Sequence, residues 1–209
     1  MKEIDIETWP RKEHFEFFSR IAYPFYSLTV DIDVSAFHKF VKRNQLSFYY
    51  SMIYLSTKAM NQIEAFRYRI RGEKIVLLDD LIPSFTDMPK GSDLFCITNV
   101  ALTPTIYDYT SACKNAVENQ KQYFPTAKDE SFDHYIYYSS VPWIHFTSVT
   151  HEMDANKDDA ITRITFGKFE KKDEALMMPI SIAANHRFVD GLHIHQYLNL
   201  LQASLNQLN

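Results

Sequence analysis

The chain has 209 residues, of which 46% are hydrophobic and 23% charged, values typical of a folded globular protein rather than a disordered one. Its 22 Lys and Arg against 26 Asp and Glu give a formal net charge of −4, which argues against nucleic acid or an anionic membrane as a partner. Cys96 and Cys113 are too few for a disulfide framework, and only 4 glycines argue against a glycine-rich phosphate loop. The acidic N-terminus lacks the apolar core of a signal peptide, so we expect a single cytoplasmic domain over residues 1–209.

The first half of the chain alternates between strand and helix patterns. Apolar and polar residues alternate over 26–33, which predicts a half-buried strand. Ser35 is a candidate cap for a short helix, and Ser47 opens a longer amphipathic one. A turn at residues 71–73 indicates a hairpin, followed by a strand over 94–101 and a helix from about Thr103 to Tyr123.

The last third is predicted to be mostly sheet. Residues 135–146, 161–169 and 176–185 are rich in aromatic and β-branched side chains, which favour strands. After Asp190 and Gly191 the apolar spacing becomes that of an amphipathic helix reaching the C-terminus. Hairpins and scattered helices without strict βαβ alternation predict an α+β fold, a two-layer sandwich of helices packed on a mixed, largely antiparallel sheet.

The segment with the clearest chemistry begins where the last predicted strand ends. His186 follows that strand, and Asp190-Gly191 turns the chain into the final helix, so an imidazole and a carboxylate come close together. An Asp-Gly pair before a helix is also an ordinary cap, and a histidine at a strand end is often a satisfied polar residue. The HxxxDG pattern by itself leaves both interpretations open.

Four further blocks resolve this choice by resemblance. Together with HxxxDG they closely resemble the chloramphenicol acetyltransferase family, in the same order and at near-constant spacing over the whole chain. The blocks are WPRKEHFEF at residues 9–17, FYYSMIYL at 48–55, SSVPW at 139–143 and TFGKF at 165–169.

The resemblance implies an enzyme that transfers the acetyl group of acetyl-CoA directly to a hydroxyl, within a ternary complex. Chloramphenicol is the leading acceptor, which would make the chain an antibiotic-resistance protein, and the family forms homotrimers with active sites at subunit interfaces. Acetyl-CoA is then a cosubstrate, and no tightly bound cofactor and no metal are expected. His186 matches the general base, and Ser139 matches the hydroxyl that stabilises the oxyanion, with Ser140 as the alternative if the register slips. We expect the imidazole to lie in a cleft that this serine pair faces.

The remaining site residues also come from the resemblance. Asp190 matches a carboxylate in a buried ion pair with Arg11, which fixes the turn that carries the histidine. Thr165 matches a residue that holds an ordered water near the oxyanion. The residues matched to the CoA site are Tyr49, Phe169 and Trp143, and those matched to the acceptor pocket are Phe18, Pro24 and Tyr26.

The sequence departs from the family pattern beside His186 and in the loop over 150–160. Asn185 replaces a histidine before His186, and Arg187 replaces a small residue after it. The loop over 150–160 is charged where the family has mostly apolar, drug-contacting residues; its polar members here include His151, Glu152, Asp154, Lys157, Asp158 and Asp159, beside Met153. A charge facing an apolar ligand is unfavourable, which leaves open an acceptor other than chloramphenicol.

Three alternatives therefore stay open. The first is a metal enzyme using His186, His193 and His195, although positions two apart on a helix point to different faces. The second is an acyltransferase for another hydroxylated acceptor, as in the dihydrolipoyl acyltransferase cores that share HxxxDG. The third is a catalytically silent, trimeric binding protein.

Overall fold

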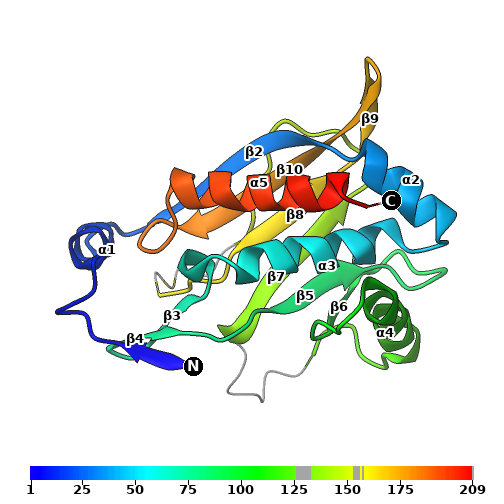
Figure 1. Ribbon diagram of the computed structural model, residues 1–209. Helices are drawn as coiled ribbons and strands as arrows, with labels where there is room; N and C mark the ends of the chain where they lie inside the picture. Colours follow the sequence, from blue (N-terminus) through cyan, green and yellow to red (C-terminus); the bar gives the residue numbers. More distant parts are fainter. Residues whose placement is uncertain (126–132, 153–155, 157, 209) are drawn as a thin grey trace.

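A mixed sheet forms the centre of the computed structural model, which describes residues 1–125, 133–152, 156 and 158–208 (Figure 1). Within these residues the sheet has seven strands in the order β2-β10-β8-β7-β5-β6, with β9 paired to β10. The pairs β5–β7 and β7–β8 are parallel, and the other pairs are antiparallel. The strands are β2 (Phe25–Asp33), β5 (Ile82–Asp87), β6 (Cys96–Asn99), β7 (Tyr135–Val141), β8 (Arg163–Gly167), β9 (Glu170–Lys172) and β10 (Ala175–Asn185).

Helices cover one face of this sheet, which confirms the expected α+β sandwich. In Figure 1, α3 and α5 lie across the same face, α2 and α4 lie toward one end of them, and α1 lies beyond the opposite end. Their apolar faces and the strands enclose one core, to which Met52, Ile164 and Tyr197 contribute. The helices are α1 (Lys12–Ser19), α2 (Ser35–Arg43), α3 (Phe48–Asn61), α4 (Ile106–Asn119) and α5 (Gly191–Asn206). No helix within the described ranges combines the length and the apolar character needed to span a membrane.

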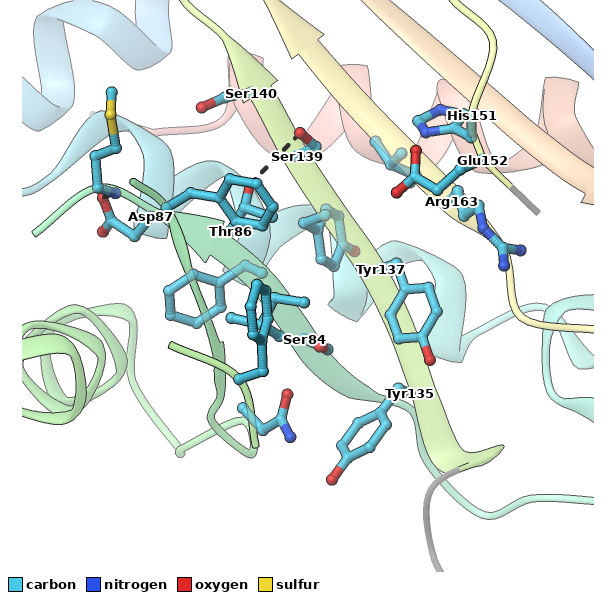
Figure 2. Close-up of a pocket in the computed structure, with 18 of the residues that line it drawn as sticks. Ser84, Thr86, Asp87, Tyr135, Tyr137, Ser139, Ser140, His151, Glu152 and Arg163 are labelled. Atoms are coloured by element: carbon cyan, nitrogen blue, oxygen red, sulfur yellow. Dashed lines mark hydrogen bonds between the residues drawn. The ribbon is translucent and has the colours of Figure 1, made fainter. Parts of the chain in front are cut away.

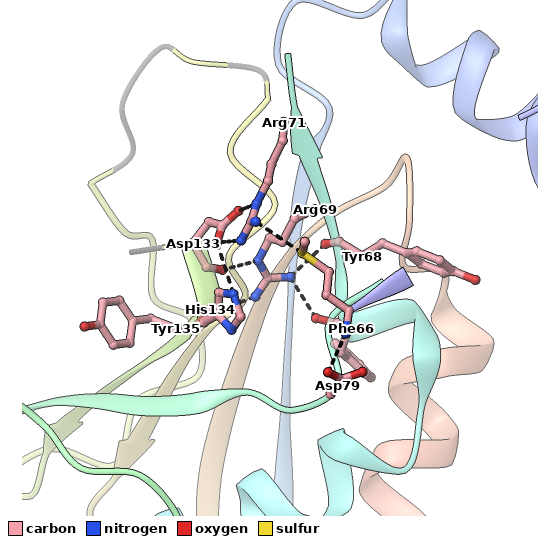
Figure 3. A network of polar contacts seen from close by, with 9 residues as sticks. Phe66, Tyr68, Arg69, Arg71, Asp79, Asp133, His134 and Tyr135 are labelled. Atoms are coloured by element: carbon pink, nitrogen blue, oxygen red, sulfur yellow. Dashed lines mark hydrogen bonds and ion pairs between the residues drawn. The ribbon is translucent and has the colours of Figure 1, made fainter. Parts of the chain in front are cut away.

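A second, small sheet is fastened to the main one by two arginines. It has the order β1-β4-β3, with β1 at Lys2–Ile4, β3 at Tyr68–Arg71 and β4 at Lys74–Leu77, and the 3₁₀ helix η1 (Glu64–Phe66) precedes β3. Figure 3 shows the buried Arg69 donating to carbonyl oxygens at the start of β7 and near η1, while Arg71 pairs with both carboxylate oxygens of Asp133. Burial lowers the pKa of Arg69 to about 10, and the surrounding carbonyls compensate the buried charge.

Several predicted boundaries were wrong by a few residues, for local reasons. Thr105 caps α4 by accepting from the Asp108 N–H at 3.1 Å, so the helix begins at Ile106 and not near Thr103. The strand predicted over 135–146 ends at Val141, because the next residue is a proline and the chain turns there. Ser35 is the first residue of α2 and not its cap, since Asp33 Oδ1 accepts from its N–H at 2.8 Å.

The helix-free face of the main sheet carries a row of hydroxyl groups. Ser139 on β7 is the register partner of Thr165 on β8, which in turn is the partner of Ser181 on β10. Thr86 at the end of β5 extends the row, because its hydroxyl lies 3.4 Å from that of Ser139. Register partners in adjacent strands share a face, so these polar side chains line one side of the sheet while α3 and α5 cover the other.

Candidate active site

His186 leaves the sheet directly after β10 and is held there by its backbone. Its N–H donates to the carbonyl oxygen of the buried Pro24 at 2.7 Å, just before β2 begins. The neighbouring pairing of Asn185 with Phe25 continues the β10–β2 ladder up to this point. The imidazole therefore projects from a fixed position at the end of two long paired strands.

Aromatic rings set the orientation of this imidazole. The Phe18 ring stacks on it with centroids 4.1 Å apart, and the Tyr26 ring lies 4.6 Å away. His186 Nδ1 lies 3.1 Å from Asp190 Oδ1, but the groups are not aligned for a hydrogen bond, and this buried nitrogen makes none within the described residues. The side chain is 35% exposed although Nδ1 is buried, so another part of the ring is open to a reactant. Of the residues predicted for the acceptor pocket, Phe18 and Tyr26 pack against this ring, whereas Pro24 contacts the His186 backbone.

Arg11 fastens the turn that follows His186. Its guanidinium donates to both carboxylate oxygens of Asp190 at 2.6 Å, and to the carbonyl oxygens of His186 at 3.1 Å and Arg187 at 2.7 Å. The hydrogen bonds and charge of Arg11 hold the pKa of the Asp190 carboxyl below its ordinary value, against the opposing effect of burial. The two side chains are 14% and 32% exposed, so the structure brings the expected partners together in a half-buried pair and not a fully buried one.

The nearby histidines of α5 have separate partners. His193 Nδ1 accepts the backbone N–H of Asp190 at 2.9 Å, which closes the first turn of the helix, and burial lowers the pKa of His193. His195 Nε2 lies 3.0 Å from the Asn199 amide instead. Across the ranges that the structure describes, no three His, Cys, Asp or Glu side chains gather as metal ligands would.

Ser139 lies in a different place, a cleft of about 1340 Å³ over β5, β7 and β8 (Figure 2). Its side chain shares a face with Tyr135 and Tyr137, which also line the cleft, whereas Tyr138 bonds to Ser56 and Thr57 on the helix side. Strand alternation therefore directs Ser139 toward the cleft and Ser140 toward the Tyr138 face, although both border the opening. Aromatic side chains make much of the cleft wall: Phe85, Phe95, Phe124, Tyr135, Tyr137 and Trp143.

One wall of this cleft is polar. His151 Nε2 lies 3.3 Å from the Thr165 hydroxyl, and burial lowers the pKa of this histidine, which favours its neutral form. Arg163 lies beside it, with its guanidinium 2.7 Å from Asp159 Oδ2 and 5.4 Å from the centre of the Tyr137 ring. Glu152 adds a carboxylate to the same wall (Figure 2). Thr165, which the resemblance matches to a residue that holds an ordered water, thus contacts an imidazole here.

The three residues matched to CoA are dispersed. Trp143 borders the cleft and is 67% exposed. Tyr49 packs edge-on against the core rings of Phe85 and Phe166, and Phe169 packs against Phe48 and His38. Neither Tyr49 nor Phe169 lines the cleft. Of the charged loop, Met153, Asp154 and Lys157 lie outside the described residues.

One chain does not bring His186 and Ser139 together. Two strand spacings of about 4.8 Å separate Ser139 from Ser181, and His186 lies five positions beyond Ser181 at about 3.3 Å per residue. The two α-carbons are therefore on the order of 19 Å apart, well beyond the reach of a serine and a histidine toward one reacting carbonyl. The expectation that the serine pair faces the imidazole is not met within a single chain.

Sequence reasoning missed the β5 side of the cleft. The short strand β5 contains Pro83 and was not predicted, so Thr86 and Asp87 were not expected to belong to the site. In the structure the Tyr50 hydroxyl donates to Asp87 at the rim of the cleft, and Thr86 contacts Ser139. Only the β5–β7 register, formed between segments far apart in sequence, reveals this contact.

Comparison with known proteins places this geometry in a family. The profile of the chloramphenicol acetyltransferase family matches residues 1–202. A protein named chloramphenicol acetyltransferase in Escherichia coli is 32% identical over 206 residues, covering 95% of this chain and 91% of that relative.

Solved structures share the fold. One chloramphenicol acetyltransferase superposes with a TM-score of 0.86 at 24% identity, covering 98% of this chain and all of that one. A probable dihydrolipoamide acetyltransferase from Listeria monocytogenes gives 0.66 at 15% identity, covering 100% of this chain and 96% of that one, which shows a shared fold alone. The family profile and the similar sequence confirm the resemblance seen in the motifs: the chain belongs to the chloramphenicol acetyltransferase family, whose members are acyltransferase enzymes.

Proposed function

We propose that this enzyme transfers the acetyl group of acetyl-CoA to a hydroxyl of a small molecule, with chloramphenicol as the first acceptor to test. One observation carries the proposal: an imidazole with one open edge projects from a strand end whose following turn is tied by Arg11 and Asp190. This is the HxxxDG arrangement of a family that acetylates hydroxyl groups. Acetyl-CoA enters as a cosubstrate, and no bound cofactor is needed.

In the proposed reaction, His186 Nε2 accepts the proton of the acceptor hydroxyl while that oxygen attacks the thioester carbonyl. A new C–O bond forms, and the carbonyl electrons move onto oxygen, where the Ser139 hydroxyl donates a hydrogen bond to the developing charge. The carbonyl then re-forms, the C–S bond breaks, and the imidazolium returns its proton to the CoA thiolate. The acetylated acceptor and free CoA thiol are the products, without an acyl-enzyme.

The site is proposed to form between two copies of the chain. Because His186 and Ser139 are on the order of 19 Å apart in one chain, His186 of one subunit must meet the cleft of its neighbour. The exposed Trp143 at the cleft border, with the exposed Ile144 next to it in the chain, supports a contact surface there. A homotrimer with three such interfaces, as in the family, satisfies this geometry.

The cleft also suggests a second candidate acceptor. Its aromatic walls suit the nitrophenyl ring of chloramphenicol, whereas His151, Glu152 and Arg163 suit a more polar molecule. Acetylation of another hydroxylated acceptor is therefore the alternative function.

Thiol release from acetyl-CoA, measured with and without chloramphenicol, tests these possibilities. Release that requires chloramphenicol and disappears in His186→Ala supports the first proposal. Release only with other alcohols selects the second acceptor class, and no release with any acceptor would leave a binding protein without activity. Release that persists in His186→Ala would contradict the role of the imidazole.

A further inference from the structure

The two residues that flank His186 are both buried and polar. Asn185 and Arg187 are each 2% exposed. A buried guanidinium is costly unless other groups compensate its charge and satisfy its donors. Their partners therefore indicate what this pair of residues does for the histidine between them.

Arg187 connects the turn after His186 to the end of the charged loop. Its Nη1 donates to Asp158 Oδ1 at 2.9 Å, and the guanidinium lies 5.5 Å from the centre of the Phe15 ring. Its Nε and backbone N–H both point to Asn185 Oδ1, at 3.4 and 3.0 Å. The backbone carbonyl oxygen of Arg187 accepts from Arg11 Nε at 2.7 Å, so both the side chain and the backbone of Arg187 are held.

Asn185 reaches the same loop by a second route. Its Nδ2 donates to the carbonyl oxygen of Asp159 at 2.9 Å. The Asp159 carboxylate in turn accepts from Arg163, whose guanidinium is part of the polar wall of the cleft. Two consecutive loop residues are therefore attached to the two neighbours of His186, one to each.

We propose that Asn185 and Arg187 are positioning residues for acetyl transfer, which clamp Asp158 and Asp159 and thereby fix the His186 imidazole. The inference rests on the proposed role of His186 as the base. Within the described residues this imidazole makes no hydrogen bond through Nδ1, so its direction depends on ring stacking, on the Asp190 carboxylate 3.1 Å away and on the backbone at its two neighbours. A base displaced by a fraction of an ångström from the acceptor proton loses rate, because proton transfer requires close alignment.

Arg187→Ala and Asp158→Asn are the variants that open the clamp. We expect Arg187→Ala to lower kcat at least tenfold with chloramphenicol, or with whichever acceptor the thiol-release assay identifies, while KM for acetyl-CoA changes less than twofold. Asp158→Asn should also lower kcat, because it removes the carboxylate that pairs with Arg187. The double variant should be no worse than Arg187→Ala, because both changes break one contact. Arg187→Lys keeps a cation for Asp158 and should recover part of the loss.

Arg71→Ala is the matched control. It removes another ion pair, with Asp133, that lies in the small-sheet network of Figure 3 and does not contact His186 or its flanking residues. Thermal melting of all variants, with assays well below the lowest midpoint, separates a general loss of stability from a loss of alignment. Arg71→Ala should melt at a lower temperature with an unchanged kcat.

A readout without any acceptor separates this inference from the proposed function. Diethyl pyrocarbonate modifies neutral imidazoles, and peptide mass mapping follows His186 against His195. We expect the modification rate of His186 relative to that of His195 to rise at least threefold in Arg187→Ala. The rise should be smaller in Arg187→Lys and absent in Arg71→Ala. If the wild type acetylates nothing, the function fails while this ratio still tests the clamp. A ratio and a kcat within twofold of wild type in the Arg187 and Asp158 variants would overturn the clamp.

Discussion

The Phe18 ring stacks on the His186 imidazole with 4.1 Å between centroids and 11° between planes. This contact joins the end of α1 to the end of β10, two segments that no sequence pattern connects. It orients a ring whose buried Nδ1 makes no hydrogen bond within the described residues.

Replacing Phe18 by alanine should reduce acetyl transfer without unfolding the protein. Aromatic pairs contribute about 0.5 to 1.5 kcal/mol beyond their buried area, so we expect kcat to fall by about 2- to 10-fold if all of this energy orients the base. Steady-state rates measure the effect, and Phe18→Tyr, which keeps the ring, is the control. Equal rates in the alanine and tyrosine variants would show that the stacking does not orient the base.

Asp190→Asn should destabilise the fold and lower activity together, because it leaves the Arg11 guanidinium without its anion. We expect a loss of about 1 to 3 kcal/mol in the free energy of unfolding, below the 3 to 5 kcal/mol of a fully buried pair because the carboxylate is about one-third exposed. Chemical denaturation at pH 7 measures this loss. Full activity with an unchanged midpoint would contradict the role of the pair.

The same variant should also change the pH dependence of stability. The pKa of Asp190 is lowered in the folded state, chiefly by the Arg11 hydrogen bonds, so its contribution is complete above the ordinary carboxyl pKa near 3.8 and is lost as the pH falls through the lowered value. The stability difference between wild type and Asp190→Asn should therefore shrink on acidification below that range. A difference that grows in acid would mean that another group dominates.

Ser139→Ala should cost far more than Ser140→Ala. Losing one oxyanion donor typically lowers kcat by about 10²- to 10³-fold, and strand alternation directs Ser139 toward the cleft. Parallel kinetics of the two alanine variants, with melting curves for both, make the comparison. If Ser140→Ala is the more damaging change, the register assignment from the motif is wrong.

Mixing two inactive variants should restore activity if the site lies between subunits. In a ring assembled at random from equal amounts of His186→Ala and Ser139→Ala chains, about one-quarter of the interfaces combine an intact His186 with an intact Ser139. Co-refolding the two variants should therefore recover about a quarter of the wild-type rate per site. Activity that stays at the level of the separate variants would require both groups to act within one chain.

His151→Leu tests which acceptor the polar wall favours. The change removes an imidazole whose neutral form burial favours and replaces it with an apolar group of similar size. If this wall disfavours chloramphenicol, KM for the drug should fall severalfold while KM for acetyl-CoA stays constant. Glu152→Gln, a neutral change on the same wall, is the companion variant. A rise in KM for chloramphenicol would mean that His151 contacts the drug favourably.

The sequence alone predicted the elements whose own residues determine them. The alternation in β2, the Ser47 cap and apolar stripe of α3, and the final helix after Asp190 are local patterns, and the structure contains all three. The helix α1 was not predicted; it is short, and none of its residues is fully buried. Matching blocks along the chain also identified the family, because each motif keeps its chemistry in consecutive residues.

Tertiary structure decided how those pieces combine. The HxxxDG pattern and the family resemblance together predicted a base at a strand end, but only the register across β7, β8 and β10 shows that His186 and Ser139 of one chain are far apart. The contacts of Arg187 with Asp158 and of Thr165 with His151 likewise join residues whose spacing carries no periodic signal. Local patterns report the conformation of neighbouring residues, whereas a site assembled across strands depends on distances that the packed sheet alone determines.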